Sequence, residues 1–274
     1  DLGGTNIKAG IIDENHKILA QTSAPIGVER PAEEVIADMA VLVRQLMDTL
    51  GMDESMLAGI GVGCPGLVDA DVGVVRYSNN ISWENVALVK ELGNYFSCEI
   101  RISNDANCAA LGEVKAGAAK NVSNAILLTL GTGVGGGIIL DGKVFEGSNA
   151  GGAELGHISM ILGGEPCTCG RRGCVETYVS ATALIRDAKR AAAANKKSLL
   201  NQMCGGVLEH MNGRIPFDAA LAGDKVAKEV VENYYTYLAE AVANYVNIFR
   251  PDVVILAGGV CNRIGCLTAS VEEH

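Results

Sequence analysis

Three cysteines and a histidine near the middle of the chain have the types and the spacing of a metal site. Cys167, Cys169 and Cys174 lie within eight positions, and His157 precedes the first of them by ten residues. Thiolates and imidazole suit Zn²⁺ better than Mg²⁺ or Ca²⁺, and four protein ligands close its coordination sphere. A redox pair or a chance cluster is the alternative. We expect a structural Zn²⁺ site that does not activate water.

Two glycine-rich segments have the composition of phosphate-binding loops. In Asp1–Asn6, glycines let backbone amides approach phosphate oxygens, Thr5 adds a hydroxyl donor, and Asp1 suits a hydrated Mg²⁺. No Gly-Lys-Ser/Thr follows, so the segment is not a Walker loop. The second segment, Leu130–Gly137, separates two apolar stretches. Either segment alone is equally typical of a tight hairpin, but two such loops facing each other would hold a triphosphate.

Several acidic and amide side chains are candidates for contacts with a substrate. Asn104 and Asp105 stand at the end of an expected strand, where they suit a helix cap. The same carboxylate could accept a hydroxyl proton during phosphoryl transfer, and both roles are compatible. Glu154, His157 and Glu176 flank the cysteines and suit hydrogen bonds to a polyhydroxylated ligand, although isolated acids are more often solvated surface residues.

The elements that must position these residues repeat along the chain. Apolar runs and turn residues predict strands at 7–12, 18–22, 60–64, 99–102, 125–130, 138–140 and 253–256. Helical spacing predicts helices from Pro31 to Gly51 and over 86–96, 106–115, 181–194 and 225–249. The order of hairpin, helix and strand occurs twice, with a glycine loop in each half. We therefore expect two similar α/β lobes, 1–115 and 116–274.

Composition limits the possible partners. The 274 residues carry a net charge of −10, which argues against a nucleic-acid surface. No apolar run is long enough to span a membrane, and no signal-peptide pattern opens the sequence. Six of the nine cysteines are scattered singly, as expected for reduced thiols in the cytoplasm. The loop at Asp1 lacks a preceding strand and His274 follows no closing element, so we expect a trimmed domain, truncated at its C-terminus.

Six motifs occur in the order typical of one family. They are Asp1-Leu-Gly-Gly-Thr, Gly63-Cys-Pro-Gly66, Asn104-Asp-Ala-Asn107, Leu130-Gly-Thr-Gly133, Glu154-Leu-Gly-His157 and Cys167-x-Cys-Gly-x-x-Gly-Cys-x-Glu176. Together they resemble the ROK family, which contains bacterial sugar kinases and sugar-responsive repressors. The resemblance runs from Asp1 to about Gly259, and its cysteine motif is the most specific part. It implies the two-lobed, actin-like ATPase and sugar-kinase (ribonuclease H-like) fold with a zinc knot, whose lobes close over ATP and sugar.

The resemblance also implies roles for individual residues. Asp105 corresponds to the catalytic base that takes the proton of a sugar hydroxyl. The implied sugar ligands are Gly66, Asn80, Asn104, Asp105, Glu154, His157 and Glu176. The implied nucleotide contacts are Asp1, Gly3, Gly4, Thr5, Asn6 and Lys8 in the first loop, Gly131, Thr132 and Gly133 in the second, and Gly258 and Gly259 in an adenosine loop. The implied cofactors are ATP, Mg²⁺ and a structural Zn²⁺ held by His157 and the three cysteines.

A short segment favours one hexose over others. Asn79-Asn-Ile-Ser-Trp-Glu-Asn-Val86 resembles a segment of glucokinases in this family, which implies phosphorylation of glucose at O6. Kinases for fructose, N-acetylmannosamine, N-acetylglucosamine and allose share the remaining motifs and stay as alternatives. A sugar-sensing repressor without its DNA-binding domain is the rival class. Family members are commonly dimers or tetramers, so a homo-oligomer is expected.

Overall fold

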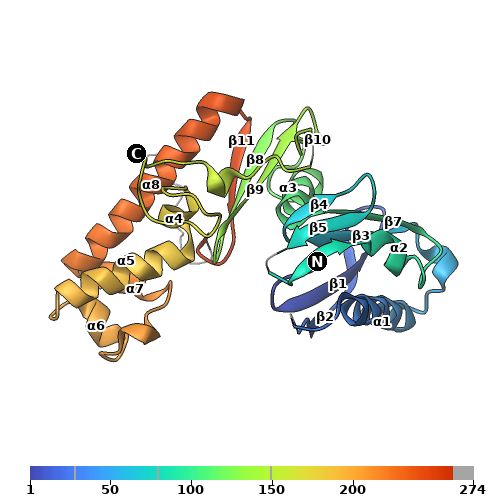
Figure 1. Cartoon of the computed structure of the whole chain (residues 1–274), viewed down its shortest axis with the longest axis horizontal. Helices are drawn as coiled ribbons and strands as arrows, with labels where there is room; N and C mark the ends of the chain where they lie inside the picture. The colour runs from blue at the N-terminus through green and yellow to red at the C-terminus, as the bar shows by residue number, and fades with distance from the viewer. Residues whose placement is uncertain (28, 79, 149, 262–274) are drawn as a thin grey trace. The chain divides into compact units, whose positions relative to one another are not determined.

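The computed structural model describes residues 1–27, 29–78, 80–148 and 150–261. It divides into two compact units, which are described separately below (Figure 1). The first unit contains Asp1–Asn121 and Ile138–Ala153, and the second contains Val122–Gly137 and Glu154–His274. The expected lobes, 1–115 and 116–274, differ from these units mainly at 138–153, because the chain returns to the first unit there.

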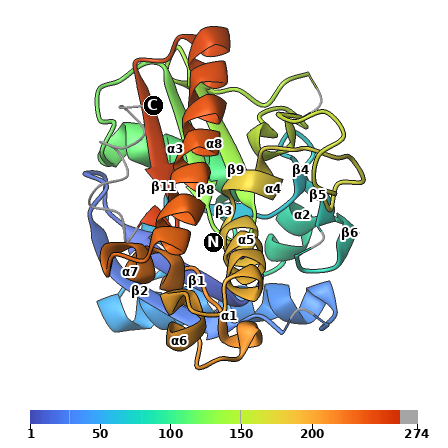
Figure 2. The same ribbon diagram turned by 90° about the vertical axis from the view of Figure 1, so that its left-hand side faces the viewer.

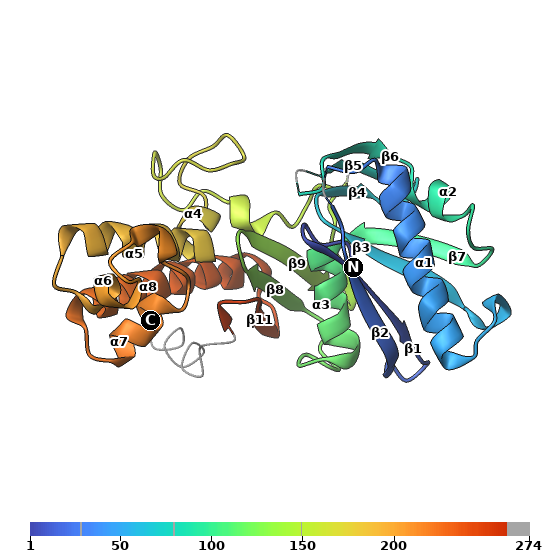
Figure 3. The ribbon, with the colours of Figure 1, turned by 90° about the horizontal axis from the view of Figure 1, so that it is seen from below.

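The first unit is built from short sheets and helices. Its elements are β1 (Asn6–Ile12), β2 (Ile18–Pro25), α1 (Ala32–Leu50), the 3₁₀ helix η1 (Glu54–Met56), β3 (Gly59–Cys64), β4 (Leu67–Asp69), β5 (Val74–Ser78), β6 (Trp83–Val86), α2 (Leu88–Leu92), β7 (Glu99–Asn104), α3 (Asp105–Ala116) and β10 (Lys143–Val144). Strands β1 and β2 pair antiparallel, β3 and β7 pair parallel, and β4, β5 and β6 form an antiparallel sheet. Helix α1 packs on the β1–β2 hairpin (Figure 3).

Local sequence accounts for the start of this unit. Asp13 closes the first hairpin, since its Oδ1 accepts hydrogen bonds from the amides of Asn15 and Lys17, both at 2.9 Å. Helix α1 follows Pro31 and ends at Gly51, whose φ of 64° is a left-handed conformation that favours glycine. The predicted hairpin and the first predicted helix are therefore confirmed.

The segment after β5 differs from its prediction. A helix was expected over 86–96, but Val86 ends β6 and pairs with Val75, and the helix α2 covers only Leu88–Leu92. Trp83, also in β6, is buried in the core of the unit. Cross-strand pairing and this burial outweigh the helical spacing of the apolar residues, because tertiary contacts routinely override local propensity.

The second unit combines a sheet with a group of helices. Its elements are β8 (Ala125–Leu130), β9 (Val134–Leu140, which continues into the first unit), η2 (Leu155–His157), α4 (Glu176–Val179), α5 (Ala181–Ala194), α6 (Leu199–Met203), η3 (Leu208–His210), α7 (Ile215–Leu221), α8 (Lys225–Phe249) and β11 (Val253–Ala257). The strand order is β10-β9-β8-β11, and β11 runs parallel to β8. Helices α5 and α7 pack against α8, which runs along this sheet (Figures 2 and 3).

The second glycine segment is shorter than its sequence suggests. It was expected to be a loop through Gly137 with a strand from Ile138, but β9 already begins at Val134. Hydrogen bonding to β8 holds these glycines in a strand despite their low β propensity. The turn at Asp141 and Gly142 is present as predicted, with both residues at positive φ.

The long helices of this unit agree with their predicted ranges, 181–194 and 225–249. Within the described residues, no helix combines the length and the apolar character needed to cross a membrane.

Candidate active site and metal centre

The predicted metal ligands lie together in the second unit. The ligand atoms of His157, Cys167, Cys169 and Cys174 all lie within 4.8 Å of one another. Cys169 Sγ lies 3.7 Å from Cys174 Sγ, and Cys167 Sγ lies 3.5 Å from His157 Nδ1. Tetrahedral Zn²⁺ with ordinary bond lengths requires sulfur–sulfur separations of about 3.8 Å and sulfur–nitrogen separations of about 3.6 Å. The donor set and its spacing therefore fit Zn²⁺.

Backbone contacts bring the histidine to the cysteines. Ser159 pairs with Cys174 in an antiparallel bridge, and the guanidinium of Arg171 donates to the His157 carbonyl at 3.1 Å. Gly173 has a φ of 76°, and a side chain there would collide with the carbonyl oxygen of Ile161. A glycine at this position is therefore required for the tight return of the chain into Cys174.

The ionisation of the thiols also favours a cation. Burial, together with the neighbouring Cys169 and Cys167, raises the pKa of Cys174 to about 12. Burial likewise raises the pKa of Cys167. Three thiolates at this separation repel one another, so a divalent cation among them is the natural means of holding them ionised.

Glu176 connects the cysteine cluster to the second glycine loop. Its Oε2 accepts a hydrogen bond from the Val134 amide at 2.9 Å. Its Oε1 lies 3.5 Å from Thr168 Oγ1 and 3.8 Å from Cys167 Sγ. A side chain at Gly133 would collide with the Glu176 carboxylate, which explains the glycine at that position. This carboxylate therefore contacts the predicted nucleotide loop as well as the predicted metal loop.

The turn that carries Glu154 and His157 packs against the same loop. The His157 amide donates to the Glu154 carbonyl at 3.0 Å. Between them, Gly156 lies so close to Val134 that a side chain would meet its carbonyl oxygen. The buried hydroxyl of Tyr245, from α8, donates to the Leu155 carbonyl at 2.7 Å. No local sequence pattern predicted that Tyr245 would fix this turn.

The predicted nucleotide segments of this unit meet at the carboxyl ends of β8 and β11. A Cβ on Gly258 would lie 2.5 Å from the Leu130 carbonyl oxygen, and the φ of Gly258 is 103°. The Ala181 amide, at the start of α5, donates to the Gly131 carbonyl at 2.8 Å, and Thr182 Oγ1 donates to the Thr132 carbonyl at 2.7 Å. A helix N-terminus beside a turn of partly exposed glycines is an arrangement that favours anions.

In the first unit, Asn104 and Asp105 stand at the junction of β7 and α3. Asn104 Oδ1 caps the helix by accepting from the amides of Ala106 and Asn107, and its Nδ2 donates to the Gly66 carbonyl at 3.1 Å. Asp105 keeps solvent access, but the surrounding protein desolvates its carboxyl and raises its pKa. A raised pKa makes a carboxylate a better proton acceptor at neutral pH.

The first glycine loop is a tight turn with an exposed tip. The Gly3 amide donates to the Asn6 carbonyl at 2.9 Å, and the Asp1 carboxylate lies 3.6 Å from Lys8 Nζ. Gly4, Thr5 and Asn6 are exposed. A Cβ built on Gly4 would lie 3.6 Å from Cβ of Asn80, so the structure places that predicted sugar ligand beside the loop.

One acidic residue near Asp105 was missed by the sequence analysis. Glu146 Oε1 accepts hydrogen bonds from Ser103 Oγ at 3.0 Å and from Asn107 Nδ2 at 3.1 Å. This carboxylate thereby ties the segment after β10 to the start of α3. No local pattern marks it, because its partners lie about forty residues earlier in the chain.

Two cavities within the units lie apart from most predicted ligands. A cavity of about 780 Å³ in the first unit is lined mainly by apolar side chains of β1, α1 and β3, with Asp1 and Lys8 also in its lining. A cavity of about 450 Å³ in the second unit lies between α5 and α8. Neither contains Asn104, Asp105, Glu154, His157 or Glu176 in its lining.

The fold and these motifs define a protein of the sugar-kinase class of α/β folds. Residues 1–274 match the ROK family, and the chain belongs to that family. It is 37% identical over 274 residues to a glucokinase of Thermotoga maritima, covering 100% of this chain and 84% of that protein. The structure is also similar to the crystal structure of a ROK family glucokinase from Streptomyces griseus in complex with glucose and AMPPNP. The TM-score is 0.82 at 31% identity, covering 99% of this chain and 86% of that chain.

Regulators of the same family are also similar to this chain. The DNA-binding transcriptional dual regulator NagC of Escherichia coli is 30% identical over 281 residues. That alignment covers 99% of this chain but 65% of NagC. The family match and the similar glucokinase structure confirm the expected family and the sugar-kinase fold, while the zinc knot stays a prediction.

Proposed function

We propose that the chain transfers the γ-phosphoryl group of ATP to a hexose, with glucose phosphorylated at O6 as the favoured reaction. The enzyme class is an ATP-dependent hexokinase-type phosphotransferase. The observation that carries the proposal is the Asp105 carboxylate, which has a raised pKa and adjoins an asparagine fixed by three hydrogen bonds. The glucokinase of Thermotoga maritima and the glucose complex from Streptomyces griseus support glucose as the substrate.

Asp105 acts as the general base. Phosphoryl transfer passes through a loose transition state, so catalysis depends on positioning and charge neutralisation more than on covalent chemistry. The carboxylate accepts the proton of the attacking hydroxyl as the new oxygen–phosphorus bond forms. Asn104 holds the start of α3 and orients Asp105 through its cap. In the first unit, Gly66 and Asn80 are proposed further contacts to the hexose.

The proposed roles in the second unit follow the same chemistry. Glu154, His157 and Glu176 hydrogen bond to hexose hydroxyls, as polar groups on short, fixed turns can. The backbone of Gly131–Gly133 receives phosphate oxygens, and Gly258 and Gly259 receive the adenosine.

Two metal ions belong to the proposal. Asp1 would hold Mg²⁺ through water, and the ion, when bound with ATP, would supply positive charge beside the transferred phosphoryl group. Zn²⁺ would be held by His157, Cys167, Cys169 and Cys174, and it contributes to folding rather than to the reaction. Four protein ligands would close the coordination sphere of Zn²⁺, so a role in the reaction is not part of the proposal.

A coupled assay of ADP release tests the proposal directly. Purified protein is given ATP and Mg²⁺ with a panel of glucose, fructose, mannose, allose, N-acetylglucosamine and N-acetylmannosamine. ADP formed with glucose at the highest kcat/KM supports the proposal, and a different preferred hexose corrects the substrate alone. Hexose binding without ADP release from any sugar would contradict the kinase assignment and favour the sugar-sensing class.

A further inference from the structure

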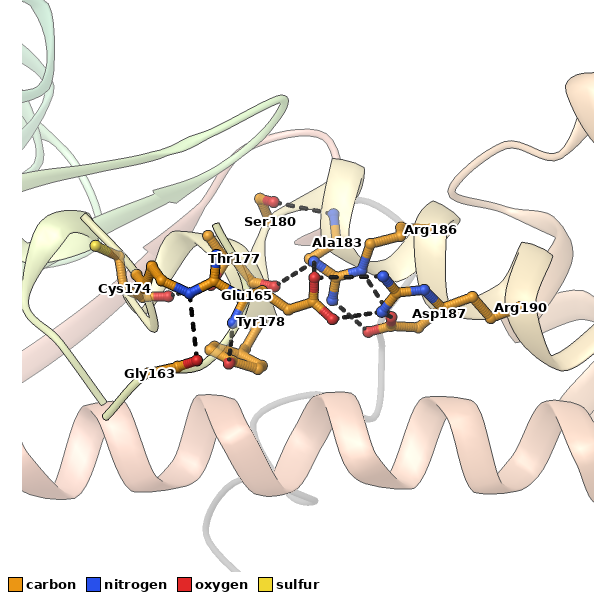
Figure 4. A network of polar contacts seen from close by, with 11 residues as sticks. Gly163, Glu165, Cys174, Thr177, Tyr178, Ser180, Ala183, Arg186, Asp187 and Arg190 are labelled. Carbon is orange, nitrogen blue, oxygen red and sulfur yellow. Dashed lines mark hydrogen bonds and ion pairs between the residues drawn. The ribbon is translucent and has the colours of Figure 1, made fainter. Parts of the chain in front are cut away.

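A network of charged side chains joins α5 to the base of the loop that carries Cys167, Cys169 and Cys174, called the cysteine loop below (Figure 4). Arg186 donates through Nε and an NH₂ group to both carboxylate oxygens of Asp187, each at 2.8 Å. Arg190 donates to both oxygens of Glu165, at 2.5 and 3.3 Å. Arg186 also lies 3.9 Å from Glu165, and Arg190 lies 3.6 Å from Asp187. We call these four side chains the α5 clamp.

The two arginines of the clamp hold the Glu165 carboxylate, and the backbone of Glu165 in turn holds the cysteine loop. The Glu165 amide donates to the hydroxyl of Tyr178 at 2.9 Å, and the Glu165 carbonyl accepts from the Gly173 amide at 2.8 Å. Glu165 precedes Cys167 by two residues, and Gly173 directly precedes Cys174. The pair Glu165–Gly173 therefore closes the base of the loop that carries three of the proposed zinc ligands.

Arg186 reaches a second target, the short helix α4. It donates to the Thr177 carbonyl at 2.8 Å, and Thr177 directly follows Glu176. Thr177 Oγ1 in turn donates to the Cys174 carbonyl at 2.7 Å. One guanidinium thus fixes the backbone beside Glu176 while it also faces the carboxylate at the base of the cysteine loop.

The exposure of these side chains argues for a geometric role. Arg186 and Glu165 each keep 26% of their side-chain surface exposed, and Arg190 keeps 59%. Ion pairs with such solvent access contribute little to the free energy of unfolding. The planar guanidinium, however, fixes direction at several acceptors at once, which a simple point charge does not. Precise orientation is therefore the larger effect of this network.

We infer that Arg186 is a positioning residue, which holds the cysteine loop and the short helix α4, with Glu176 at its start, in fixed positions against α5. The inference rests on the proposed function for its kinetic consequences, but its structural consequence is independent of any activity. The loss of contacts that orient metal ligands typically changes metal affinity or activity by about 10- to 100-fold. Arg190 contacts Glu165, whereas the bond to Thr177 comes from Arg186, so the loss of Arg190 should affect the cysteine loop more than Glu176.

Amide hydrogen exchange read by mass spectrometry is the primary test. Arg186→Gln in the intact chain should speed exchange in peptides covering 163–178 by about tenfold, because the Glu165 carboxylate and the Thr177 carbonyl lose the guanidinium that holds these segments, so their amides open more often. Lys189→Gln, on the same helix but outside the clamp, should leave these peptides unchanged. Equal protection in Arg186→Gln and wild type would overturn the inference. If Arg186→Gln fails to fold, the exchange of the same peptides is measured in Arg186→Lys and Arg190→Gln. Protection equal to that of wild type in both variants would overturn the inference.

Metal retention and kinetics provide a second test. Arg186→Gln should release zinc to a chelator about tenfold faster and raise the hexose KM about tenfold, with kcat and the ATP KM within about twofold. Arg186→Lys should not restore the hexose KM, because the lysine ammonium lacks the planar set of donors that the guanidinium directs at several acceptors. An equal fall in kcat for all substrates, with normal hexose KM, would contradict a positioning role. If wild type phosphorylates no hexose, the proposed function fails, while the exchange result still decides the inference.

Discussion

The carboxylate of Glu176 accepts a hydrogen bond from the backbone amide of Val134 at 2.9 Å. The two residues are separated by 42 positions, and they join the start of β9 to the segment that follows the cysteine loop. The same carboxylate approaches Thr168 and Cys167 with its other oxygen. One side chain thus links the predicted phosphate loop with the predicted metal loop.

Replacing Glu176 tests this link. Glu176→Ala leaves the Val134 amide without its acceptor, and hydrogen bonds to charged groups contribute about 1.5–3 kcal/mol. We expect the KM for hexose and the KM for ATP to rise by on the order of tenfold. Glu176→Gln keeps one oxygen acceptor and should affect the ATP KM less than Glu176→Ala. Identical ATP KM values for wild type and Glu176→Ala would show that the link has no functional effect.

Replacing Asp105 tests the proposed base. Asp105→Asn keeps the side-chain shape but cannot accept the proton, so kcat should fall by at least about 100-fold. Hexose affinity, measured by calorimetry, should stay within about tenfold of wild type. Asn104→Ala serves as the comparison, since it removes the helix cap and leaves the carboxylate. Turnover like that of wild type in Asp105→Asn would refute the assignment of the base.

The raised pKa of Asp105 predicts how activity depends on pH. A general base works when it is deprotonated, so kcat/KM should decline as pH falls through the raised pKa, above the usual value of about 3.9. Since the folded state binds this proton more tightly than the unfolded state, the carboxylate lowers stability at pH values above its raised pKa. Asp105→Asn should therefore unfold at the same or a higher temperature than wild type at pH 7. An acidic limb at the ordinary aspartate value would contradict the desolvation argument.

Removal of zinc tests the proposal that this metal supports folding and does not take part in the reaction. Chelation, or Cys169→Ser, should lower the unfolding temperature and weaken hexose binding, because metal binding is coupled to folding of the loop. Cys98→Ser provides the matched control, since Cys98 is a free thiol outside the cluster. Metal content is checked by elemental analysis. Zinc loss without any change in thermal stability or hexose affinity would refute the structural role.

Adjacent glycines allow a matched test of the predicted adenosine loop. A Cβ at Gly258 would press on the Leu130 carbonyl, and its φ of 103° disfavours any other residue, whereas a Cβ at Gly259 meets nothing within 4 Å. Gly258→Ala should lower the free energy of unfolding by about 1–3 kcal/mol and raise the ATP KM. Gly259→Ala should leave stability close to that of wild type. Equal stability of the two variants in urea unfolding would show that the close approach is not maintained in solution.

The elements that sequence reasoning located well are those with a strong local signal. Helices α5 and α8 have long apolar stripes and polar caps at Ser180 and Asp224, so their ranges agree with prediction. The cap at Asn104 is equally local, because its partners lie two and three residues away. The short strands β4, β5 and β6 lack such a signal, since they contain few residues and depend on pairing with one another.

The sequence by itself determined the family, the quartet of soft ligands, the two glycine loops and the carboxylate at the start of α3. These follow from residue types at short spacing, where chemistry and turn geometry leave few alternatives. Only the tertiary structure decided that Glu176 contacts Val134, that Glu146 contacts Ser103, and that Arg186 holds Thr177. Such contacts depend on packing between segments that are distant in the sequence. The type of a single acidic or arginine residue does not predict which partner packing will place beside it.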